Sequence, residues 1–360
     1  MPYPTKKLGE ICNIVYGFAF KANAFNEIGK GLPVIRIGDV DKCKTNKFFD
    51  GKYDKKYLIK KNDILLGLSG SFKANRWEGD AALLNQRVAT LRNFKDKITE
   101  DFIFYQMPRL FVQFEKTITQ LSVKNILTKH LENLKILYPP AEVQKQIVKR
   151  LDKIAEAQKL NDELIQKAEE LYRSLRNNVV NVKIKKQKWP MIRFGDILDY
   201  EQPGKYIVQT KICKEKTEDC LPVLTANKAF ILGYTEEKEG IYKDIPVIIF
   251  DDFTTDKKFV DFPFKVKSSA MKILKLKTKN ANLRFVFETM EKIKFNHETH
   301  KRYYLSEYQH IKITFPPLKI QKQIVAKLSA VQDYKKQLLG QKSKLKELFD
   351  SVLTKSMKGN

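Results

Sequence analysis

The amino-acid sequence predicts a mixed α/β (α+β) fold, in which two globular regions are separated by two long helices that form an antiparallel coiled coil within the chain. Three observations support this prediction. The chain has 360 residues, which is long for a single domain. Its two halves contain matching segments in the same order, so the chain is an internal pseudo-repeat. Each half also ends in a long segment with the periodicity of a coiled coil.

The duplication is clearest where each half ends. Residues 139–152 read PPAEVQKQIVKRLD and residues 316–329 read PPLKIQKQIVAKLS, with eight of fourteen positions identical at an offset of 177. The halves also begin alike, since Leu8-Gly9-Glu10-Ile11 corresponds to Phe194-Gly195-Asp196-Ile197. Between these matches the sequences differ. The two halves therefore share the segments at their starts and ends and differ in the sequence between them.

These matches divide the chain into four segments. Residues 1–140 form a first globular region and residues 186–317 a second, each with short β-rich runs separated by Gly, Asn, Asp and Lys turns. Residues 141–185 form a central helix and residues 318–360 a C-terminal helix. The order of strands inside the globular regions does not follow from the sequence.

Each long helix begins after Pro-Pro, which cannot continue a strand but suits the first turn of a helix. Apolar residues then recur every seven positions: Ile324, Val331, Leu338, Leu345 and Val352 in the C-terminal helix, and Ile147, Ile154, Ala168 and Leu175 in the central one. About 40 residues at about 1.5 Å each give a rod of roughly 60 Å. Because neither helix can bury its apolar stripe alone, we expect the two to pack on each other. Asn161 occupies the same series and either fixes the register or is merely tolerated.

Composition gives a first indication of a partner. The formal net charge is +26, and the excess of basic over acidic residues is found in all four segments. Such an excess is typical of proteins that bind nucleic acid, because it neutralises phosphates. A lysine-rich chain with 11 arginines among its 68 basic residues is also what an A+T-rich genome encodes, so charge alone does not decide.

Other classes of protein are disfavoured by the sequence. The four cysteines contain no CxxC pair, which argues against a disulfide scaffold and a structural zinc site. We find no signal peptide and no apolar run long enough for a membrane helix, and therefore expect a cytoplasmic protein.

The tandem of two dissimilar globular regions, each closed by a helix that opens with Pro-Pro-x-x-x-Gln-x-x-Ile-Val, resembles the specificity subunits of Type I restriction–modification enzymes. Further segments carry the same resemblance: Leu84-Asn85-Gln86-Arg87-Val88-Ala89 in the first region, and Pro222–Lys228 and Phe250–Thr255 in the second. In that family the globular regions are target recognition domains, and the helices are shared conserved regions that act as a ruler between them.

The resemblance implies a non-catalytic subunit that recognises a bipartite, asymmetric DNA site. It implies double-stranded DNA, two methyltransferase subunits and motor–nuclease subunits as partners. S-adenosylmethionine, ATP and Mg²⁺ are expected on those partner subunits and not on this chain. We expect the helix openings to dock the methyltransferases through Gln144, Gln146, Ile147, Gln321, Gln323 and Ile324.

Base edges are read by Arg or Lys on guanine and by Asn or Gln on adenine, so polar and basic loops are the places to look for DNA contacts. In the first region the candidates are Lys73, Asn75, Arg76, Gln86, Arg87, Lys124 and Asn125. In the second region they are Thr225, Asn227, Lys228, Thr254, Thr255, Lys257, Lys258, Lys301, Arg302 and Tyr303.

Two other functions fit parts of the sequence. Asp252 followed by Asp256-Lys257-Lys258 loosely resembles the acidic and lysine residues of a Mg²⁺-dependent nuclease, although the spacing is short and the other half has no such set. A coiled-coil scaffold that binds DNA without reading its sequence is also compatible with the duplication.

Overall fold

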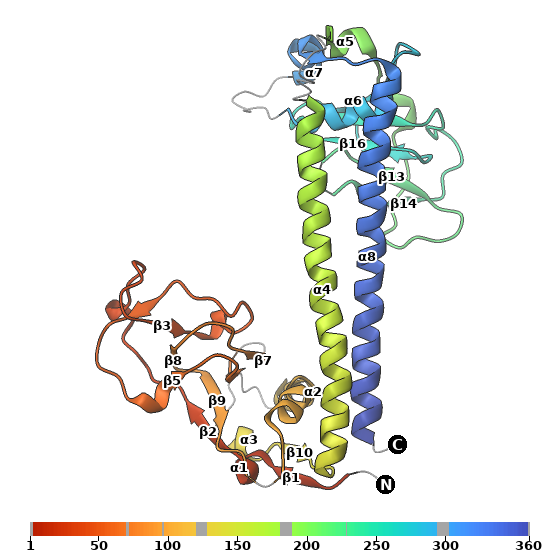
Figure 1. Cartoon of the computed structure of the whole chain (residues 1–360). Coiled ribbons are helices and arrows are strands. Elements are labelled where there is room, and N and C mark those ends of the chain that lie inside the picture. The colour runs from red at the N-terminus through yellow and green to blue at the C-terminus, as the bar shows by residue number, and fades with distance from the viewer. Residues whose placement is uncertain are drawn as a thin grey trace. The chain divides into compact units, whose positions relative to one another are not determined.

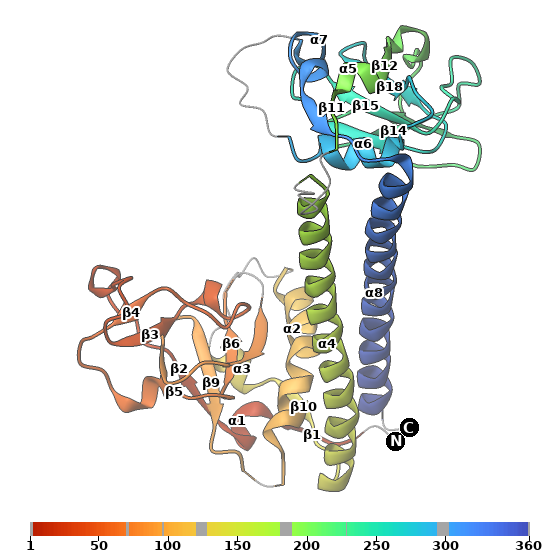
Figure 2. The ribbon, with the colours of Figure 1, turned by 45° about the horizontal axis from the view of Figure 1, so that its top comes forward.

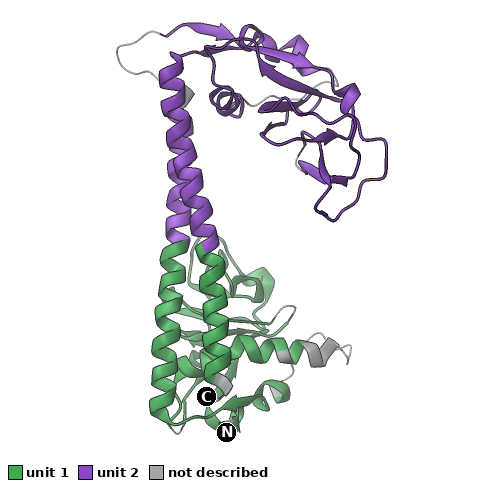
Figure 3. Ribbon diagram, turned by 90° about the vertical axis from the view of Figure 1, so that its right-hand side faces the viewer, with its two compact units in different colours: residues 1–161, 341–360 green, residues 162–340 purple. Residues whose placement is uncertain are grey.

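The protein is described from a computed structural model that covers residues 3–69, 72–95, 97–119, 128–180, 189–227, 229–293 and 302–358. The chain divides into two compact units (Figure 3). Unit 1 contains residues 1–161 and 341–360, and unit 2 contains residues 162–340. Each unit therefore combines one globular domain with part of each long helix.

Among the described residues, the globular domain of unit 1 contains two four-stranded sheets and one strand pair. The first sheet is antiparallel with the order β2-β9-β6-β7, and the second has the order β4-β3-β8-β5 with β3 and β8 parallel. The pair β1–β10 joins the start of the domain to its end. The elements are β1 (Thr5–Lys7), α1 (Leu8–Ile11), β2 (Asn13–Tyr16), β3 (Leu32–Ile35), β4 (Phe48–Phe49), β5 (Leu58–Ile59), β6 (Ile64–Gly67), β7 (Lys73–Arg76), β8 (Ala82–Leu84), β9 (Val88–Arg92), α2 (Glu100–Thr119), α3 (Thr128–Glu132) and β10 (Lys135–Leu137).

The globular domain of unit 2 repeats this topology among its described residues except for a counterpart of β5. Its antiparallel sheet has the order β12-β18-β15-β16, a three-stranded sheet has the order β14-β13-β17 with β13 and β17 parallel, and β11 pairs with β19. The elements are β11 (Met191–Arg193), α5 (Phe194–Ile197), β12 (Leu198–Glu201), β13 (Leu221–Leu224), β14 (Ile231–Thr235), β15 (Val247–Asp251), β16 (Lys257–Val260), β17 (Lys265–Val266), β18 (Met271–Leu276), α6 (Leu283–Met290), α7 (Tyr303–Ser306) and β19 (Lys312–Thr314). The pseudo-repeat predicted from the sequence is therefore present in the fold.

The central strand of each antiparallel sheet joins two cores, because successive side chains of a strand point to opposite faces. In β15, Ile248 and Phe250 enter the core that contains Phe285 of α6. Ile249 enters the core that contains Phe264. Both faces of this strand are thus covered, which explains its continuous apolar sequence.

The long helices are α4 (Ala141–Val180) and α8 (Leu318–Lys358), which lie side by side and antiparallel, as Figures 1 and 2 show. In unit 1, Gln158 Nε2 donates a hydrogen bond to the carbonyl of Leu345 (3.3 Å). In unit 2, Lys335 Nζ lies 2.7 Å from a carboxylate oxygen of Glu169. The antiparallel intramolecular coiled coil predicted from the heptads is confirmed, and Asn161 is buried.

No helix in the described part of the chain is long and apolar enough to cross a membrane.

Candidate nucleic-acid interface

The turn between β8 and β9 presents two of the predicted DNA-contacting residues of unit 1. Gln86 and Arg87 are exposed, whereas Asn85 beside them is buried. Arg87 has a φ of 66°, a conformation that is uncommon for a residue with a side chain and is often found at functional sites. The amide of Gln86 donates to the carbonyl of Phe18 (2.9 Å), which fixes the turn to the segment after β2. This hydrogen bond therefore fixes the backbone from which the side chains of Gln86 and Arg87 project.

The three candidates on β7 are engaged within the chain. Lys73 forms an ion pair with Asp41, and the side-chain amide of Asn75 donates through Nδ2 to the carbonyl of Val40 (3.2 Å).

The guanidinium of Arg76 has the most partners of the three. It donates to the carbonyl of Asn62 (2.9 Å), forms ion pairs with Glu100 and Asp101, and lies over the ring of Phe104. These contacts tie β7 to α2, so Arg76 has a structural part, and its DNA contact stays a prediction. Lys124 and Asn125 lie outside the described residues.

In unit 2, the loop between β15 and β16 divides the predicted residues into exposed and buried ones. Asp251 Oδ1 accepts hydrogen bonds from the amides of Phe253 and Thr254 (both 2.9 Å), and these two residues are exposed at the tip. Thr255 is buried, with a φ of 54°. The side chain of Thr254 is thus exposed and that of Thr255 is not, and DNA contact by either residue stays a prediction.

Lys257 is likewise buried, and its contact with DNA stays a prediction. Its ammonium donates to the carbonyl of Thr255 (3.4 Å) and lies over the ring of Tyr308. Burial lowers the pKa of Lys257. The sequence did not indicate this burial, because a lysine beside a turn is usually solvated and no local signal shows that this one points inward.

The first residues of α7 are tethered to the same loop. The amides of Tyr303 and Tyr304 donate to the carbonyl and the carboxylate of Asp252 (2.9 and 3.0 Å). Tyr303 is buried, whereas Arg302 is exposed, and DNA contact by either residue stays a prediction. The structure thus brings Arg302 and the loop of Thr254 together, although 48 residues separate them in the sequence.

Asp252 is itself committed to the fold. Its carboxylate lies 3.1 Å from the ammonium of Lys272, and the side chains of both are almost completely buried. The carboxylate that the nuclease interpretation requires is thus already paired. The described residues contain no group of three or more His, Cys, Asp or Glu that could hold a metal ion.

The remaining candidates of unit 2 lie near the end of β13 and in β16. Asn227 is exposed, and its Oδ1 accepts a hydrogen bond from the amide of Ala229 (3.0 Å). Thr225 is mostly buried, and Lys258 is partly exposed. Lys228 and Lys301 lie outside the described residues.

The repeated glutamines, Gln144 and Gln321, join each globular domain to the start of a long helix by hydrogen bonds. Gln144 accepts a hydrogen bond from the amide of Thr99 (3.0 Å) and donates to the carbonyl of Pro139 (2.9 Å). Gln321 accepts one from the amide of Asn282 (2.8 Å) and donates to the carbonyl of Pro316 (2.8 Å). Both side chains are fully buried. The hydrogen-bonding groups of Gln144 and Gln321 are therefore used inside the chain, and the docking role predicted for them stays a prediction.

The other predicted docking residues differ in exposure. Ile147 is buried and Ile324 is partly buried, so both belong mainly to the packing of the helices. Gln146 and Gln323 are exposed and remain available to a partner.

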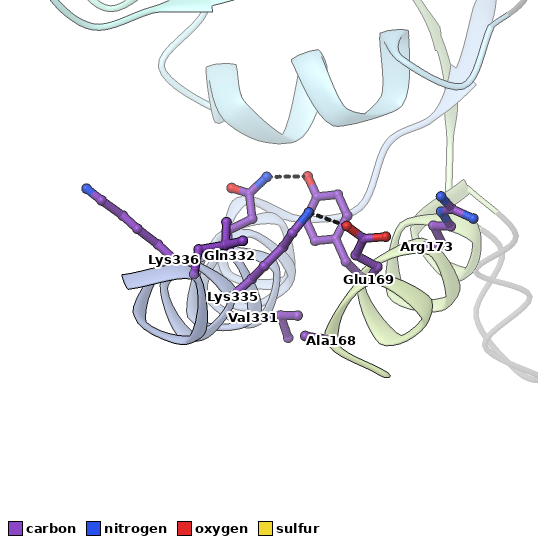
Figure 4. A pocket seen from close by; sticks show the side chains of 9 residues that line it. Ala168, Glu169, Arg173, Val331, Gln332, Lys335 and Lys336 are labelled. Carbon is purple, nitrogen blue, oxygen red and sulfur yellow. Dashed lines mark hydrogen bonds and ion pairs between the residues drawn. The ribbon is translucent and has the colours of Figure 1, made fainter. Parts of the chain in front are cut away.

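A second contact joins α6 to both long helices in unit 2. Tyr172 Oη donates to Glu288 (2.9 Å), and Arg284 donates to both Glu288 (3.0 Å) and Gln332 (3.1 Å). Gln332 in turn donates to Tyr172 Oη (2.8 Å), which closes a ring of hydrogen bonds. Burial, followed by the charge of Glu288, raises the pKa of Tyr172 to about 12. Figure 4 shows Gln332 in this network beside the ion pair of Lys335 with Glu169.

The corresponding contact in unit 1 is aromatic. The equivalence of Thr99 with Asn282 places Tyr105 where unit 2 has Glu288, and the offset of 177 places Phe349 where it has Tyr172. The rings of Tyr105 and Phe349 lie with their centroids 5.8 Å apart, and Tyr105 Oη donates to Asp152 (2.5 Å).

Two domains of one topology, each presenting exposed polar loops and each locked to a shared pair of helices, define a tandem recognition protein. The model of the Type I restriction modification DNA specificity domain matches residues 2–170 and residues 186–347. The chain belongs to this family, and the identification made from the sequence is confirmed.

Individual relatives agree with the family. The chain is similar to the specificity subunit of the Type I restriction enzyme EcoR124I/EcoR124II of Escherichia coli, with 47% identity over 34% of this chain and 31% of the relative. It is similar to the EcoBI specificity subunit of Escherichia coli, with 32% identity over 40% of this chain and 31% of the relative. The matching stretches therefore span less than a third of the length of these two curated relatives.

Solved structures resemble the whole chain. The S subunit of a Type I restriction-modification system from M. genitalium has a TM-score of 0.61 at 14% identity, covering 99% of this chain and 96% of that one. A structure concerned with complex assembly and conformational transition of the type I R-M system has a TM-score of 0.57 at 15% identity, covering 99% and 98%. At these identities the likeness shows the fold.

Proposed function

We propose that the chain is the non-catalytic DNA specificity subunit of a Type I restriction–modification enzyme, in which each globular domain reads one half of a split, asymmetric site. The observation that supports this most is the repetition of one topology with different exposed loops. Two domains with the same backbone fold are expected to bind DNA in related ways, while their different side chains give different base preferences.

The residues proposed to contact DNA are those that the structure leaves exposed. They are Gln86 and Arg87 in unit 1, and Asn227, Thr254 and Arg302 in unit 2. Glutamine and asparagine can pair with adenine, and arginine with guanine. Lys258 and the other exposed lysines are proposed to contact phosphates and to give binding its salt dependence.

The partners proposed are two methyltransferase subunits and the motor–nuclease subunits, which carry S-adenosylmethionine, ATP and Mg²⁺. Three leucines of α4 support a docking role for the helices, because Leu160, Leu164 and Leu171 are 53%, 40% and 50% exposed. Their spacing of four and seven residues places them on one face of the helix. The exposed Gln146 of unit 1 and Gln323 of unit 2 stay proposed docking residues, each within its own unit.

The experiment is to co-express the chain with the methyltransferase encoded beside it and to map methylated adenines by single-molecule sequencing. We expect a split motif that is lost when the chain is omitted. Combined Gln86→Ala and Arg87→Ala substitutions are expected to relax one half of the motif, and Arg302→Ala the other half. Ile28→Ala, which changes a residue that is 85% exposed in unit 1, is the control. Methylation that is unchanged without the chain would exclude the proposal.

Incubation of the chain alone with Mg²⁺ and plasmid tests the nuclease alternative. Cleavage that is lost in Asp256→Ala would establish it. We expect no cleavage, because Asp252 is held by Lys272.

A further inference from the structure

A hollow of about 490 Å³ in unit 1 lies between the segment after β2 and the segment before β5. It is lined by Phe18, Phe20, Lys52, Tyr53, Asp54, Lys56 and Tyr57. Volumes of this order are typical of sites for small ligands. The lining combines aromatic rings with lysines, which distinguishes this hollow from a gap in an apolar core.

Two of the rings are open to solvent although aromatic side chains are favoured inside. Phe18 is 48% exposed and Tyr53 is 41% exposed. Phe18 is nevertheless held in place from below, because its ring lies 5.1 Å from the centroid of Phe20 and 5.4 Å from that of Tyr57. The hollow is thus a preformed aromatic platform with an exposed face.

The platform is fixed to the turn that is proposed to read bases. Phe18 donates its amide to the carbonyl of Leu84 (3.0 Å) and accepts from the amide of Gln86 (2.9 Å). A Cβ atom on Gly17 would lie 2.0 Å from the carbonyl oxygen of Asn85, so only glycine permits this approach. A group held on Phe18 would therefore lie close to whatever Gln86 and Arg87 contact.

The charge beside the platform suits a nucleotide. Residues 51–61 contain five lysines and one aspartate. Lys56 lies 3.1 Å from Asp54 and over the ring of Tyr57 (4.9 Å), so it is held at the edge of the aromatic surface. Aromatic faces beside cationic side chains bind unstacked bases, because every base has a π face and every nucleotide carries a phosphate.

We propose that this hollow holds an unstacked nucleobase of the DNA, next to the base pairs that the turn of Gln86 and Arg87 contacts. The inference rests on the proposed function, since it requires that unit 1 binds DNA. The base stacks on Phe18 and Tyr53, and Lys52 and Lys56 lie beside its phosphate. Sequence readout in this half-site then includes the ease with which one base leaves the helix.

The test uses the complex with its methyltransferase and DNA that carries 5-iodouracil at successive positions in and beside the half-site of unit 1. Irradiation is expected to cross-link one position to Phe18, Tyr53 or Tyr57, as identified by mass spectrometry. Phe18→Ala is expected to weaken binding of the specific DNA about tenfold, as loss of a stacked base does. Phe18→Tyr, which keeps a ring, and Ile28→Ala are expected to bind as the unchanged protein does.

Each of the following outcomes would overturn the inference. Specific binding that is unchanged in Phe18→Ala, without a cross-link to these rings, would show that no base enters the hollow. Loss of methyltransferase from the Phe18→Ala complex would show that the hollow docks protein. Equal loss on unrelated DNA would indicate backbone contact only. A wild-type complex that methylates no split motif would instead refute the proposed function and the inference with it, whereas a motif without the cross-link refutes the inference alone.

Discussion

The two joints between globular domain and long helices use the same backbone frame and different side-chain chemistry. In both, a buried glutamine binds the amide that precedes an adjoining helix, and this glutamine is identical in the two halves. Six residues after this amide, Tyr105 of unit 1 contacts Phe349. At the same place in unit 2, Glu288 contacts Tyr172. The residue that satisfies backbone groups is the same in both joints, whereas the side chains that contact one another differ in chemistry.

The largest expected effect is at the ionic joint. Glu288 is almost completely buried, and Glu288→Ala leaves Arg284 and Tyr172 without their common acceptor. We expect a loss of about 3–5 kcal/mol from the stability of unit 2, as for other broken buried ion pairs. Hydrogen exchange of α6 amides measures it.

The matched variant in unit 1 is Asp152→Ala, which removes the acceptor of Tyr105. Because Asp152 is exposed, water can replace it, and we expect a loss of at most about 1 kcal/mol. Equal losses in the two units would contradict the distinction between an ionic and an aromatic joint.

The glutamine locks are expected to be equivalent. Gln144→Ala and Gln321→Ala each leave a buried amide and a proline carbonyl without a partner, which costs roughly 2 kcal/mol or more. The protection of α2 and α6 against hydrogen exchange is the measurement. Exposed Gln146→Ala and Gln323→Ala are the controls and are expected to change stability little. A large difference in lost stability between the two substitutions would show that the equivalent hydrogen bonds contribute unequally in the two units.

A smaller effect is expected for Tyr172→Phe, which removes one hydroxyl and leaves the ring. The loss of its hydrogen bond to Glu288 is expected to cost about 1 kcal/mol near neutral pH. Chemical denaturation of the two proteins in parallel gives the difference.

The pH dependence of this difference is the finest test. The pKa of Tyr172 is raised to about 12 in the folded protein, so the folded state retains a proton that the unfolded state loses. Its contribution is complete below the unfolded pKa of about 10 and is lost as the pH rises toward 12. The stability difference between the unchanged protein and Tyr172→Phe is therefore expected to shrink above about pH 10. A constant difference would show that Tyr172 titrates normally.

The sequence alone predicted the duplication, the two long helices and their antiparallel packing, because these depend on repeated motifs and on a heptad period. It did not predict the sheets, since strands of two to six residues are paired by contacts far apart in the sequence.

For the candidate site, turn chemistry indicated loops, but Lys73, Asn75 and Arg76 lie in strand β7, and it did not show which side chains point outward. Lys257 and Thr255 are buried through Tyr308 and the loop of Asp252, neither of which is a local signal. Gln144 and Gln321 were predicted to dock a partner because they recur. Recurrence is equally expected of a structural lock, and only their burial distinguishes the two.

The composition of unit 1 has a consequence for the order in which the protein is made. Residues 1–161 share their core with Leu353, and Phe349 and Val352 pack against it. A ribosome delivers these residues after all of unit 2, residues 162–340, has been synthesised. The half of the protein that is translated first therefore completes its core last. Until then Tyr105 lacks its contact with Phe349.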